Sequence, residues 1–485
     1  MGWFNGKKKT ETVFANEEAP RVFDEINTFV NSTRVAIHVR RADKMLLIRP
    51  DKTMGINESA MEILCALYHR DERPAEDVLP ALAKKLSVDN DRLLKDAQEL
   101  IYTLGAMLNE DFAPRPMLRF APFDRHRIGY PTLAEIALTY RCQNRCTFCY
   151  AASPYRGDDK DVMTTEQIKK VMHKIFHQAH VPSLSFTGGE ATLRADLLEL
   201  IGYGKELGFR VNLISNGVRS GKYEFAEKLA HAGLDSTQIS IEAGDAELHD
   251  KIVGRAGAFE KTTNAVRHFQ RLGLHVHTNS TLCGDNIQHA PELIRYVARD
   301  LKLKVMSMNM LIRTGVALAT PRMEISYQDI ADHLPKLLEV AEEESIKLVW
   351  YSPVPYCIVN PIFLGLGAKS CACIDGILSV DPNGNVLPCS SFGEGIGSLL
   401  EKDFDEIYAS APARYWREKK YLPPNCQGCA HSDICGGACP LYWDESGNFA
   451  ELPPMHGDAS AARSKWEAER CLGGSFGVDA PNLGS

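Results

Sequence analysis

The sequence predicts an α/β protein built around a partial (β/α)6 barrel, with a small winged-helix-like α+β module before it and a cysteine-rich domain after it. Three observations support this fold class. Strand-like and helical patterns alternate from residue 133 to 343, a compact strand-and-helix unit precedes them, and cysteine, glycine and proline become frequent beyond residue 350. Such alternation indicates a parallel sheet whose active residues lie at the C-terminal ends of the strands.

Length and composition narrow the class of protein. The chain has 485 residues, a net charge of -8 and fourteen cysteines, and this length predicts several domains. The charge disfavours nucleic acid or an anionic membrane as a partner. No apolar run follows Lys7 to Lys9, and no segment approaches the roughly 18 apolar residues that cross a bilayer. We therefore expect a cytoplasmic protein whose clustered cysteines hold metal.

We expect six segments along the chain. They are an N-terminal tail (1–32), a strand-and-helix module (33–110), a linker (111–132), the barrel (133–343), a cysteine-rich domain (350–475) and a C-terminal tail (476–485).

The N-terminal module is predicted to open with a half-buried strand over residues 35–39, paired in a hairpin with Met45 to Ile48. Asn57 is a good N-cap for the helix that follows. Three helices are expected, over residues 58–69, 74–86 and from 91 onward. Between residues 30 and 110, 12 Lys and Arg stand against 13 Asp and Glu, which disfavours a DNA-binding winged helix.

The alternation in the barrel segment predicts six strands and five helices. The strands are Glu135 to Thr139, Ser183 to Phe186, Arg210 to Ser215, Thr237 to Glu242, His275 to Thr281 and Lys304 to Asn309. The helices are Thr165 to His177, Arg194 to Leu207, Tyr223 to Ala232, Phe259 to Leu272 and Pro291 to Leu301. Beyond residue 350 the periodicity weakens, and we expect metal to hold that region more than a large core does.

Three cysteines follow the first predicted barrel strand, namely Cys142, Cys146 and Cys149. Three thiolates at this spacing can bind three irons of a cubane and leave the fourth iron without a protein ligand. A structural zinc site is the alternative, but it needs four ligands, and no fourth Cys or His lies nearby in the sequence.

This C-x-x-x-C-x-x-C loop, followed by the aromatic Tyr150, resembles the radical S-adenosylmethionine (SAM) superfamily. Thr187-Gly188-Gly189-Glu190 is similar to the family's glycine-glycine-glutamate motif, and Ser215-Asn216-Gly217 to its ribose-contacting turn. The resemblance implies a 4Fe-4S cluster, reductive cleavage of SAM to a 5'-deoxyadenosyl radical, and a flavodoxin- or ferredoxin-like electron donor. It implies SAM contacts from Tyr150, Gly188, Gly189, Glu190, Ser215, Asn216, Ser240 and Glu242.

The second cysteine group resembles the SPASM extension of radical enzymes that mature peptides. Its members are Cys371, Cys373, Cys389 within a G-x4-C element, Cys426, Cys429, Cys435, Cys439 and Cys471. Zinc ribbons are the alternative, which the G-x4-C element and the preceding barrel disfavour.

The resemblance implies one or two auxiliary iron-sulfur clusters. The outer one would be held by Cys426, Cys429, Cys435 and Cys471, and the inner one by Cys389 and Cys439 with Cys371 or Cys373 or both. Because a single residue separates Cys371 from Cys373, the two can hardly bind different irons of one cubane. One of them can then be left without iron, and Cys357 can take its place as a ligand. The inner centre can then be a cubane with an open iron or a 2Fe-2S cluster.

The N-terminal module resembles the PqqD-like domain, the small peptide-binding chaperone of pyrroloquinoline quinone biosynthesis. Such a domain captures a leader peptide as an added strand, and we expect the exposed edge at Met45 to Ile48. The leading hypothesis is thus a radical SAM maturase that crosslinks a ribosomally made peptide carrying a leader. The alternatives are action on a tetrapyrrole or a protein side chain, and a non-catalytic iron-sulfur electron carrier.

Overall fold

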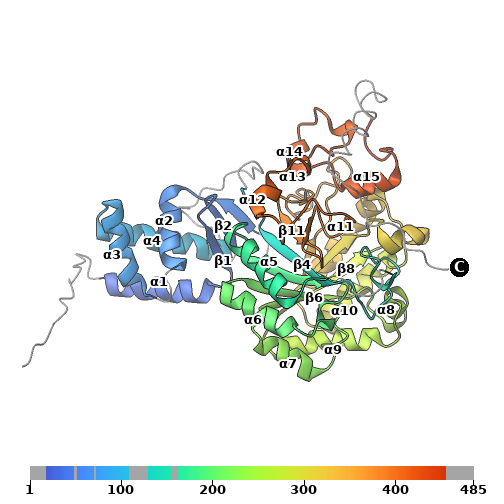
Figure 1. Cartoon of the computed structure of the whole chain (residues 1–485), viewed down its shortest axis with the longest axis horizontal. Coiled ribbons are helices and arrows are strands. Elements are labelled where there is room, and N and C mark those ends of the chain that lie inside the picture. Colours follow the sequence, from blue (N-terminus) through green and yellow to red (C-terminus); the bar gives the residue numbers. More distant parts are fainter. Residues whose placement is uncertain (1–17, 49–51, 70–72, 109–128, 156–161, 455–485) are drawn as a thin grey trace, which may run out of the picture. The chain divides into compact units, whose positions relative to one another are not determined.

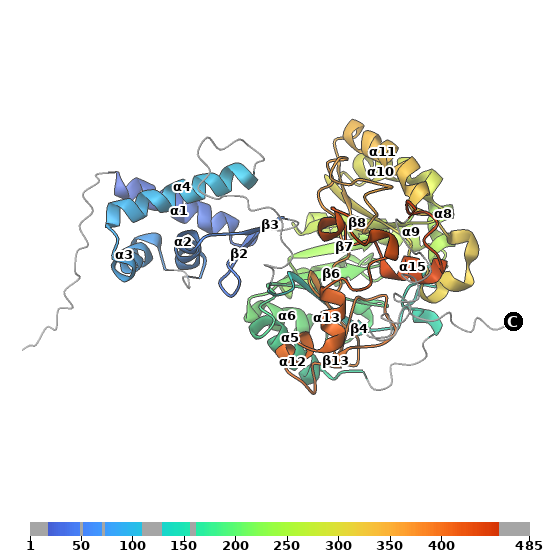
Figure 2. The same ribbon diagram turned by 90° about the horizontal axis from the view of Figure 1, so that it is seen from above.

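The computed structural model (Figures 1 and 2) describes residues 18–48, 52–69, 73–108, 129–155 and 162–454. The chain divides into two compact units, unit 1 over Met1–Gly129 and unit 2 over Tyr130–Ser485. Each unit has its own hydrophobic core. No helix within the described ranges combines the length and the apolar character needed to cross a membrane.

Unit 1 packs four helices against a three-stranded antiparallel sheet of order β1-β2-β3. The Asn57 side chain accepts a hydrogen bond from Ala60 N (2.8 Å), which confirms the predicted helix cap. The elements are α1 (Ala19–Thr33), β1 (Ile37–Arg40), β2 (Met45–Ile48), β3 (Lys52–Gly55), α2 (Glu58–Tyr68), α3 (Ala75–Leu86) and α4 (Asn90–Leu108).

Two elements of unit 1 differ from the prediction. Helix α1 lies where we expected part of an N-terminal tail, and it buries Phe23, Ile26 and Val30 on one face. Strand β3 pairs with β2, so Met45–Ile48 is the central strand and the predicted edge there is wrong. The residues of β3, Lys-Thr-Met-Gly, contain a single apolar side chain and end in glycine, so they show no strand pattern in the sequence.

Unit 2 is built on one open ten-stranded sheet of order β10-β9-β8-β7-β6-β5-β4-β11-β12-β13. The strands from β10 to β11 in this order are parallel, and the last two pairings are antiparallel. The barrel strands are β4 (Leu133–Thr139), β5 (Ser183–Gly188), β6 (Arg210–Ser215), β7 (Ser236–Ser240), β8 (His275–Leu282), β9 (Val305–Met310) and β10 (Lys347–Trp350). The six predicted strands are confirmed, and β10 adds another.

Helices follow the barrel strands and cover the sheet (Figure 2). The five predicted helices are confirmed, while α8 and α11 were not predicted. Their bounds are α5 (Thr165–His177), α6 (Leu197–Leu207), α7 (Tyr223–His231), α8 (Ala246–Val253), α9 (Ala258–Arg271), α10 (Ala290–Arg299) and α11 (Tyr327–Glu343). Reciprocal hydrogen bonds between Thr164 and Gln167 begin α5, as a capping box should.

The cysteine-rich region continues the barrel sheet. Strand β11 pairs in parallel with β4, with Ile377 opposite Leu133 and Val380 opposite Ile136. The elements of the region are β11 (Ile377–Val380), β12 (Asn385–Leu387), β13 (Gly397–Ser398), α12 (Phe404–Tyr408), α13 (Ala411–Arg417), α14 (Ser432–Cys435) and α15 (Pro440–Ser446).

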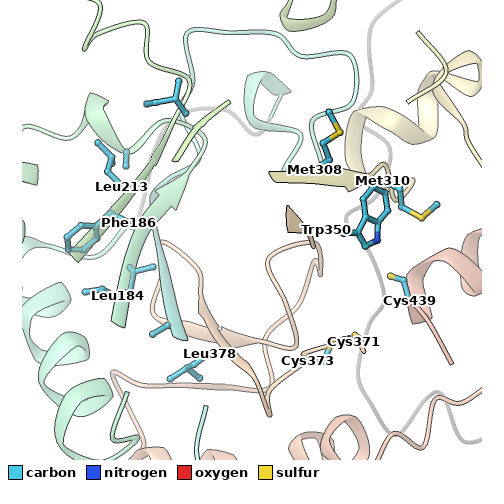
Figure 3. Packing of buried hydrophobic residues seen from close by; sticks show 14 of the residues in the cluster. Leu184, Phe186, Leu213, Met308, Met310, Trp350, Cys371, Cys373, Leu378 and Cys439 are labelled. Carbon is cyan, nitrogen blue, oxygen red and sulfur yellow. Dashed lines mark hydrogen bonds between the residues drawn. The ribbon is translucent and has the colours of Figure 1, made fainter. Parts of the chain in front are cut away.

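The same region shares the barrel's hydrophobic core, which corrects the expectation that it lacks a large one. Trp416, Tyr421 and Trp443 are at most 1% exposed and belong to the cluster that contains the barrel residues. Figure 3 shows Leu378 of β11 in this core together with Leu184 and the barrel's other apolar residues. Single aromatic residues in irregular segments carry no period, which is why the sequence did not reveal this core.

Acidification should destabilise unit 2 through His249. This side chain of α8 is 1% exposed and accepts a hydrogen bond at Nδ1 from Glu242 N (3.1 Å). Burial lowers its pKa from 6.5 to about 4, so its neutral form stabilises the fold above pH 6.5 and this contribution is lost as the pH falls toward 4.

In the variant His249→Asn the side-chain Oδ1 can replace Nδ1 as hydrogen-bond acceptor. We expect this variant to lose less stability on acidification. Between pH 7 and pH 5 the unmodified protein should lose about 2 kcal/mol more than the variant in its free energy of unfolding. Anaerobic urea unfolding at both pH values measures the difference. Parallel pH profiles for the two proteins would contradict the assignment.

Candidate functional site

The loop after β4, which carries the first three cysteines, is tied on one side to the end of α8. Arg145 N donates to Val253 O (2.9 Å), and Thr147 N donates to Ile252 O (3.0 Å). Gly254 ends α8 with φ of +62°, and a Cβ there would lie 2.5 Å from Arg145 O. Only glycine therefore lets the helix end and the loop meet this closely.

A second glycine supports the other side of the loop. Val316 N donates to Cys149 O (3.0 Å). At Gly315, where φ is +59°, a Cβ would lie 2.5 Å from Cys149 O and 2.4 Å from Tyr150 O. The sequence analysis missed both glycines because each lies more than a hundred residues from the loop it contacts.

The cysteines of this loop are partly buried. Burial raises the pKa of Cys142 to about 12, with the nearby Glu190 adding to the effect, and it raises the pKa of Cys146 well above its usual value. Asn144 N and Asn216 Nδ2 donate to Cys142 Sγ at 3.4 and 3.7 Å. Iron binds thiolates, so cluster assembly must displace protons here, while these donors stabilise the negative sulfur.

The two glycines of the glycine-glycine-glutamate motif let the end of β5 lie against the end of β4. A Cβ at Gly188, where φ is +124°, would lie 2.2 Å from Thr139 O, and one at Gly189 would lie 2.5 Å from Arg141 O. Gly189 N donates to Thr139 O (2.8 Å), and Glu190 N donates to Arg141 O (2.9 Å). The loop after β5 is thereby held against the cysteine loop.

Glu190 links the ends of β5 and β6. Its carboxylate is buried and accepts hydrogen bonds from Thr192 Oγ1 (2.6 Å), Ser215 Oγ (2.9 Å) and Asn216 N (2.9 Å). Burial raises its pKa, and these donors oppose that rise. Because Asn216 also contacts Cys142 Sγ, three of the predicted motifs form one connected group. The predicted contacts with SAM remain predictions.

The predicted site residues after β7 lie in a neighbouring position. Ser240 ends β7 opposite Asn279, while Glu242 falls just beyond the strand, which ends two residues earlier than predicted. Glu242 is buried and accepts a hydrogen bond from Thr281 N (2.8 Å). Burial raises its pKa to about 8, so a carboxyl group that can exchange a proton near neutral pH lies at the end of this strand.

Tyr150 lines a small cavity between the barrel and the cysteine-rich region, together with Glu135, Ser379 and Ser390. Ser379 Oγ donates to Glu135 Oε1 (2.6 Å) across the β4–β11 pair. Burial raises the pKa of Glu135, and its hydroxyl partners oppose that rise. Tyr150 follows Cys149 and Ser390 follows Cys389, so residues next to both cysteine-bearing segments line this one cavity.

Four cysteines lie together in an inner group that contains both members of the predicted pair, and which of them bind a cluster remains a prediction. They are Cys371, Cys373, Cys389 and Cys439. Cys371 Sγ lies 3.3 Å from Cys373 Sγ, and the thiols of Cys371 and Cys389 add to the effect of burial in raising the pKa of Cys439. Figure 3 shows Cys439 on the side of the core where Cys371 and Cys373 lie.

A buried cation that the sequence analysis missed adjoins this inner group. Lys419 is 2% exposed, and its Nζ donates to Cys371 O (2.6 Å) and pairs with Asp375 (2.7 Å). The hydrogen bond from Cys373, followed by the charge of Lys419, lowers the pKa of Cys371. The position therefore favours a thiolate, the form that iron requires.

The outer group contains Cys426, Cys429 and Cys435, as predicted, and also Cys357. The neighbouring thiols of Cys435 and Cys357 add to burial in raising the pKa of Cys426 to about 12. Cys471 lies outside the described residues. Among the described residues, no three His, Cys, Asp or Glu side chains converge closely enough to hold one metal ion, but in a cubane each thiolate binds a different iron.

Residues 136–297 match the Radical SAM superfamily, and residues 371–430 match SPASM, an iron-sulfur cluster-binding domain. The chain thus carries a radical SAM domain followed by a SPASM domain. Its cofactors are SAM, the 4Fe-4S cluster of the radical SAM domain and auxiliary iron-sulfur clusters. The thiol groups described above suit them, since cysteine thiolates are the usual ligands of such clusters.

The chain is similar to three known proteins. The AdoMet-dependent heme synthase of Oleidesulfovibrio alaskensis is 26% identical over 67% of this chain and 88% of its own length. The PqqA peptide cyclase of Bradyrhizobium diazoefficiens is 26% identical over 64% of this chain and 82% of its own length. The structure of Streptococcus suis SuiB bound to SAM matches 87% of this chain and 98% of SuiB, with a TM-score of 0.61 and 16% identity.

The close backbone contact at Gly189 predicts that two glycine-to-alanine substitutions have opposite effects on stability. Gly189→Ala should destabilise unit 2 by about 1–3 kcal/mol and reduce retained iron, because its Cβ must displace the backbone of the cysteine loop. Gly202→Ala is the matched control, since no heavy atom lies within 4 Å of a Cβ in that helix position, and it should stabilise α6 by up to about 1 kcal/mol. Anaerobic thermal unfolding and iron analysis test both. Equal stability and iron content would contradict this account.

Proposed function

We propose that this protein is a peptide maturase that crosslinks a ribosomally made peptide, with unit 1 binding the peptide's leader and unit 2 holding the chemistry. A thioether or a carbon-carbon bond is the proposed product. The observation that carries the proposal is the presence of a separate unit 1 before the radical SAM and SPASM domains. The relatives named for peptides, SuiB and the PqqA peptide cyclase, support it.

The extent of the likeness to SuiB supports a role for unit 1. Unit 2 accounts for less than three quarters of the 485 residues, so a match over 87% of the chain must extend into unit 1. A structure of SuiB bound to its precursor peptide SuiA matches 85% of this chain. We infer that the predicted residues 33–110, extended by helix α1, form the PqqD-like recognition domain, which the predicted linker 111–132 joins to the barrel.

In the proposed reaction the residues at the strand ends bind and orient the cofactors. Cys142, Cys146 and Cys149 hold the radical cluster, and Glu190 accepts hydrogen bonds that keep the SAM-binding turns in register. When bound and reduced by a flavodoxin- or ferredoxin-like donor, the cluster and SAM supply a 5'-deoxyadenosyl radical, which abstracts hydrogen from the peptide. The enclosing strands and helices exclude water from it.

The leader is proposed to add as a strand at the outer edge of β3, which pairs only with β2 among the described residues, while α2 packs against the other edge strand, β1. Ile56 N donates to Lys44 O (2.9 Å), which makes these two a hydrogen-bonded pair. Such pairs alternate along antiparallel strands, so Leu46 and Met54 form the next one. The N–H of Thr53 consequently points away from β2, toward the open edge.

Thr53→Pro should weaken leader binding because it removes this outward donor while sparing the bonds to β2. We expect a fall of about three- to tenfold in affinity for a leader-bearing peptide, the value of one main-chain hydrogen bond. Thr53→Val, which keeps the N–H, is the control and should bind normally. Anaerobic titration calorimetry or fluorescence anisotropy measures both. Equal affinity for the two variants would show that β3 is not the docking edge.

Replacing Cys142, Cys146 and Cys149 together with Ala should abolish reductive cleavage of SAM and leave the auxiliary iron in place. The remaining iron should be about eight atoms per chain for two cubanes, or about six if the inner cluster is 2Fe-2S. Chromatography of 5'-deoxyadenosine and iron analysis give the result. Cleavage that persists in the triple variant would refute the radical site, and unmodified protein that cleaves no SAM would favour an electron carrier.

A second candidate function is action on a tetrapyrrole. The observation in its favour is the set of AdoMet-dependent heme synthases, each 26% identical over 67% of this chain. The peptide hypothesis is preferred because it gives unit 1 a role. Binding of a tetrapyrrole that is unaffected by Thr53→Pro, with no binding of a precursor peptide encoded beside the gene, would favour this second function.

A further inference from the structure

Lys419 is a cation buried beside the inner cysteine group. Its side chain is 1% exposed, and it is the one buried lysine among the residues that the structure describes. Lysine is almost never fully buried unless its charge is paired, because the ammonium ion loses its hydration there. The burial of Lys419 therefore indicates that its charge has a role at this place.

The backbone of Lys419 adopts a conformation that disfavours lysine. Helix α13 is followed by its C-cap Glu418, and Lys419 comes next with φ of +53°. Glycine is the usual residue at this left-handed position after a helix, because it has no Cβ to clash with the backbone. Here a lysine occupies the position, so the contacts of its side chain have to offset this local cost.

The ammonium group lies on the backbone that carries two of the inner cysteines. Lys419 Nζ donates to Cys371 O (2.6 Å) and pairs with Asp375 Oδ2 (2.7 Å). Asp375 N in turn donates to Cys373 O (2.8 Å), and the sulfurs of Cys371 and Cys373 are 3.3 Å apart. The lysine thus holds both ends of the short segment that presents these two thiols.

The two charges of the Lys419–Asp375 pair are screened to different extents. The Asp375 side chain is 18% exposed, whereas that of Lys419 is 1% exposed. Water therefore screens the carboxylate, while the ammonium group contacts Cys371 itself in a medium of low dielectric constant. The two cysteines consequently experience a net positive field. One-electron reduction of an iron-sulfur cluster adds a negative charge, and the charge around a cluster is one of the properties that set its reduction potential.

We propose that Lys419 raises the reduction potential of the inner auxiliary cluster. In the reduction step one electron passes to the cluster from the flavodoxin- or ferredoxin-like donor, and no bond forms or breaks. Lys419 acts through its charge and through Cys371, so it is a positioning residue. This role goes beyond the proposed function and holds for a peptide or a tetrapyrrole substrate. It rests on the predicted binding of a cluster by the inner cysteines.

Potentiometric titration of the variant without the three cysteines of the radical cluster tests this role, because only auxiliary clusters then contribute electron paramagnetic resonance signals. In this background Lys419→Met, which removes the charge and keeps the length of the side chain, should lower the midpoint potential of one cluster. We expect a shift of about 59 mV, which is a tenfold change in the ratio of reduced to oxidised cluster at a fixed potential. Lys420→Met is the matched control. The Lys420 side chain is 49% exposed and pairs with Glu418, so its loss should shift neither potential.

Asp375→Asn tests the sign of the effect. It removes the negative charge and keeps the lysine, so it should raise the midpoint potential of the same cluster, and a merely structural disturbance would not give opposite shifts in the two variants. Cys439→Ala identifies the inner cluster by the signal that it removes. If Lys419→Met loses the inner iron, the shift in Asp375→Asn decides alone. Unchanged potentials at full iron content, shifts of the same sign in Lys419→Met and Asp375→Asn, or a shift confined to the other cluster would overturn the proposal.

Discussion

The close approach of backbone to backbone around the cysteine loop after β4 is the constraint on which the rest of the site depends. Gly188 and Gly189 let the backbone after β5 approach the end of β4. Gly254 and Gly315 let two other backbone segments approach the loop itself. At each place a Cβ would lie 2.2–2.5 Å from a carbonyl oxygen, so no other residue fits without movement of the backbone. These contacts hold three thiols at the end of the sheet where the polar residues of β5 and β6 also gather.

The pairing of β11 with β4 gives the auxiliary clusters a fixed relation to the radical site. A flexible linker would leave the SPASM segment free to move, but here it contributes a strand to the barrel's own sheet. The aromatic core around Trp416 belongs to the same cluster as the barrel core. The residues that follow Cys149 and Cys389, namely Tyr150 and Ser390, line the same small cavity.

Charge is also arranged differently at the two auxiliary groups. Three of the four inner cysteines are buried, Cys389 being only partly so, and the cation of Lys419 favours the thiolate of Cys371. In the outer group Cys357 and Cys429 are exposed, so water can screen its charge. A cluster in the inner position is therefore expected to be better shielded from solvent than one in the outer position. Under the proposed function, the division of the chain into two units would separate the clusters from peptide binding.

The sequence by itself determined the features that depend on neighbours along the chain. The C-x-x-x-C-x-x-C spacing, the glycine-glycine-glutamate motif and the strand and helix periods predicted the barrel, its six strands and the radical cluster loop. Local geometry also placed the Asn57 cap. In each case the determining residues lie within one turn, one strand or one loop, so composition and period were sufficient.

Only the tertiary structure decided the features that depend on residues far apart in the chain. Helix α1 required its partners in unit 1, and β3 made Met45–Ile48 a central strand. The glycines at positions 254 and 315 meet the cysteine loop from residues over a hundred positions away. The Tyr356 hydroxyl donates to Ile434 O across seventy-eight residues of sequence. Spacing cannot reveal such groupings, because folding brings these residues together through packing and hydrogen bonds rather than through sequence proximity.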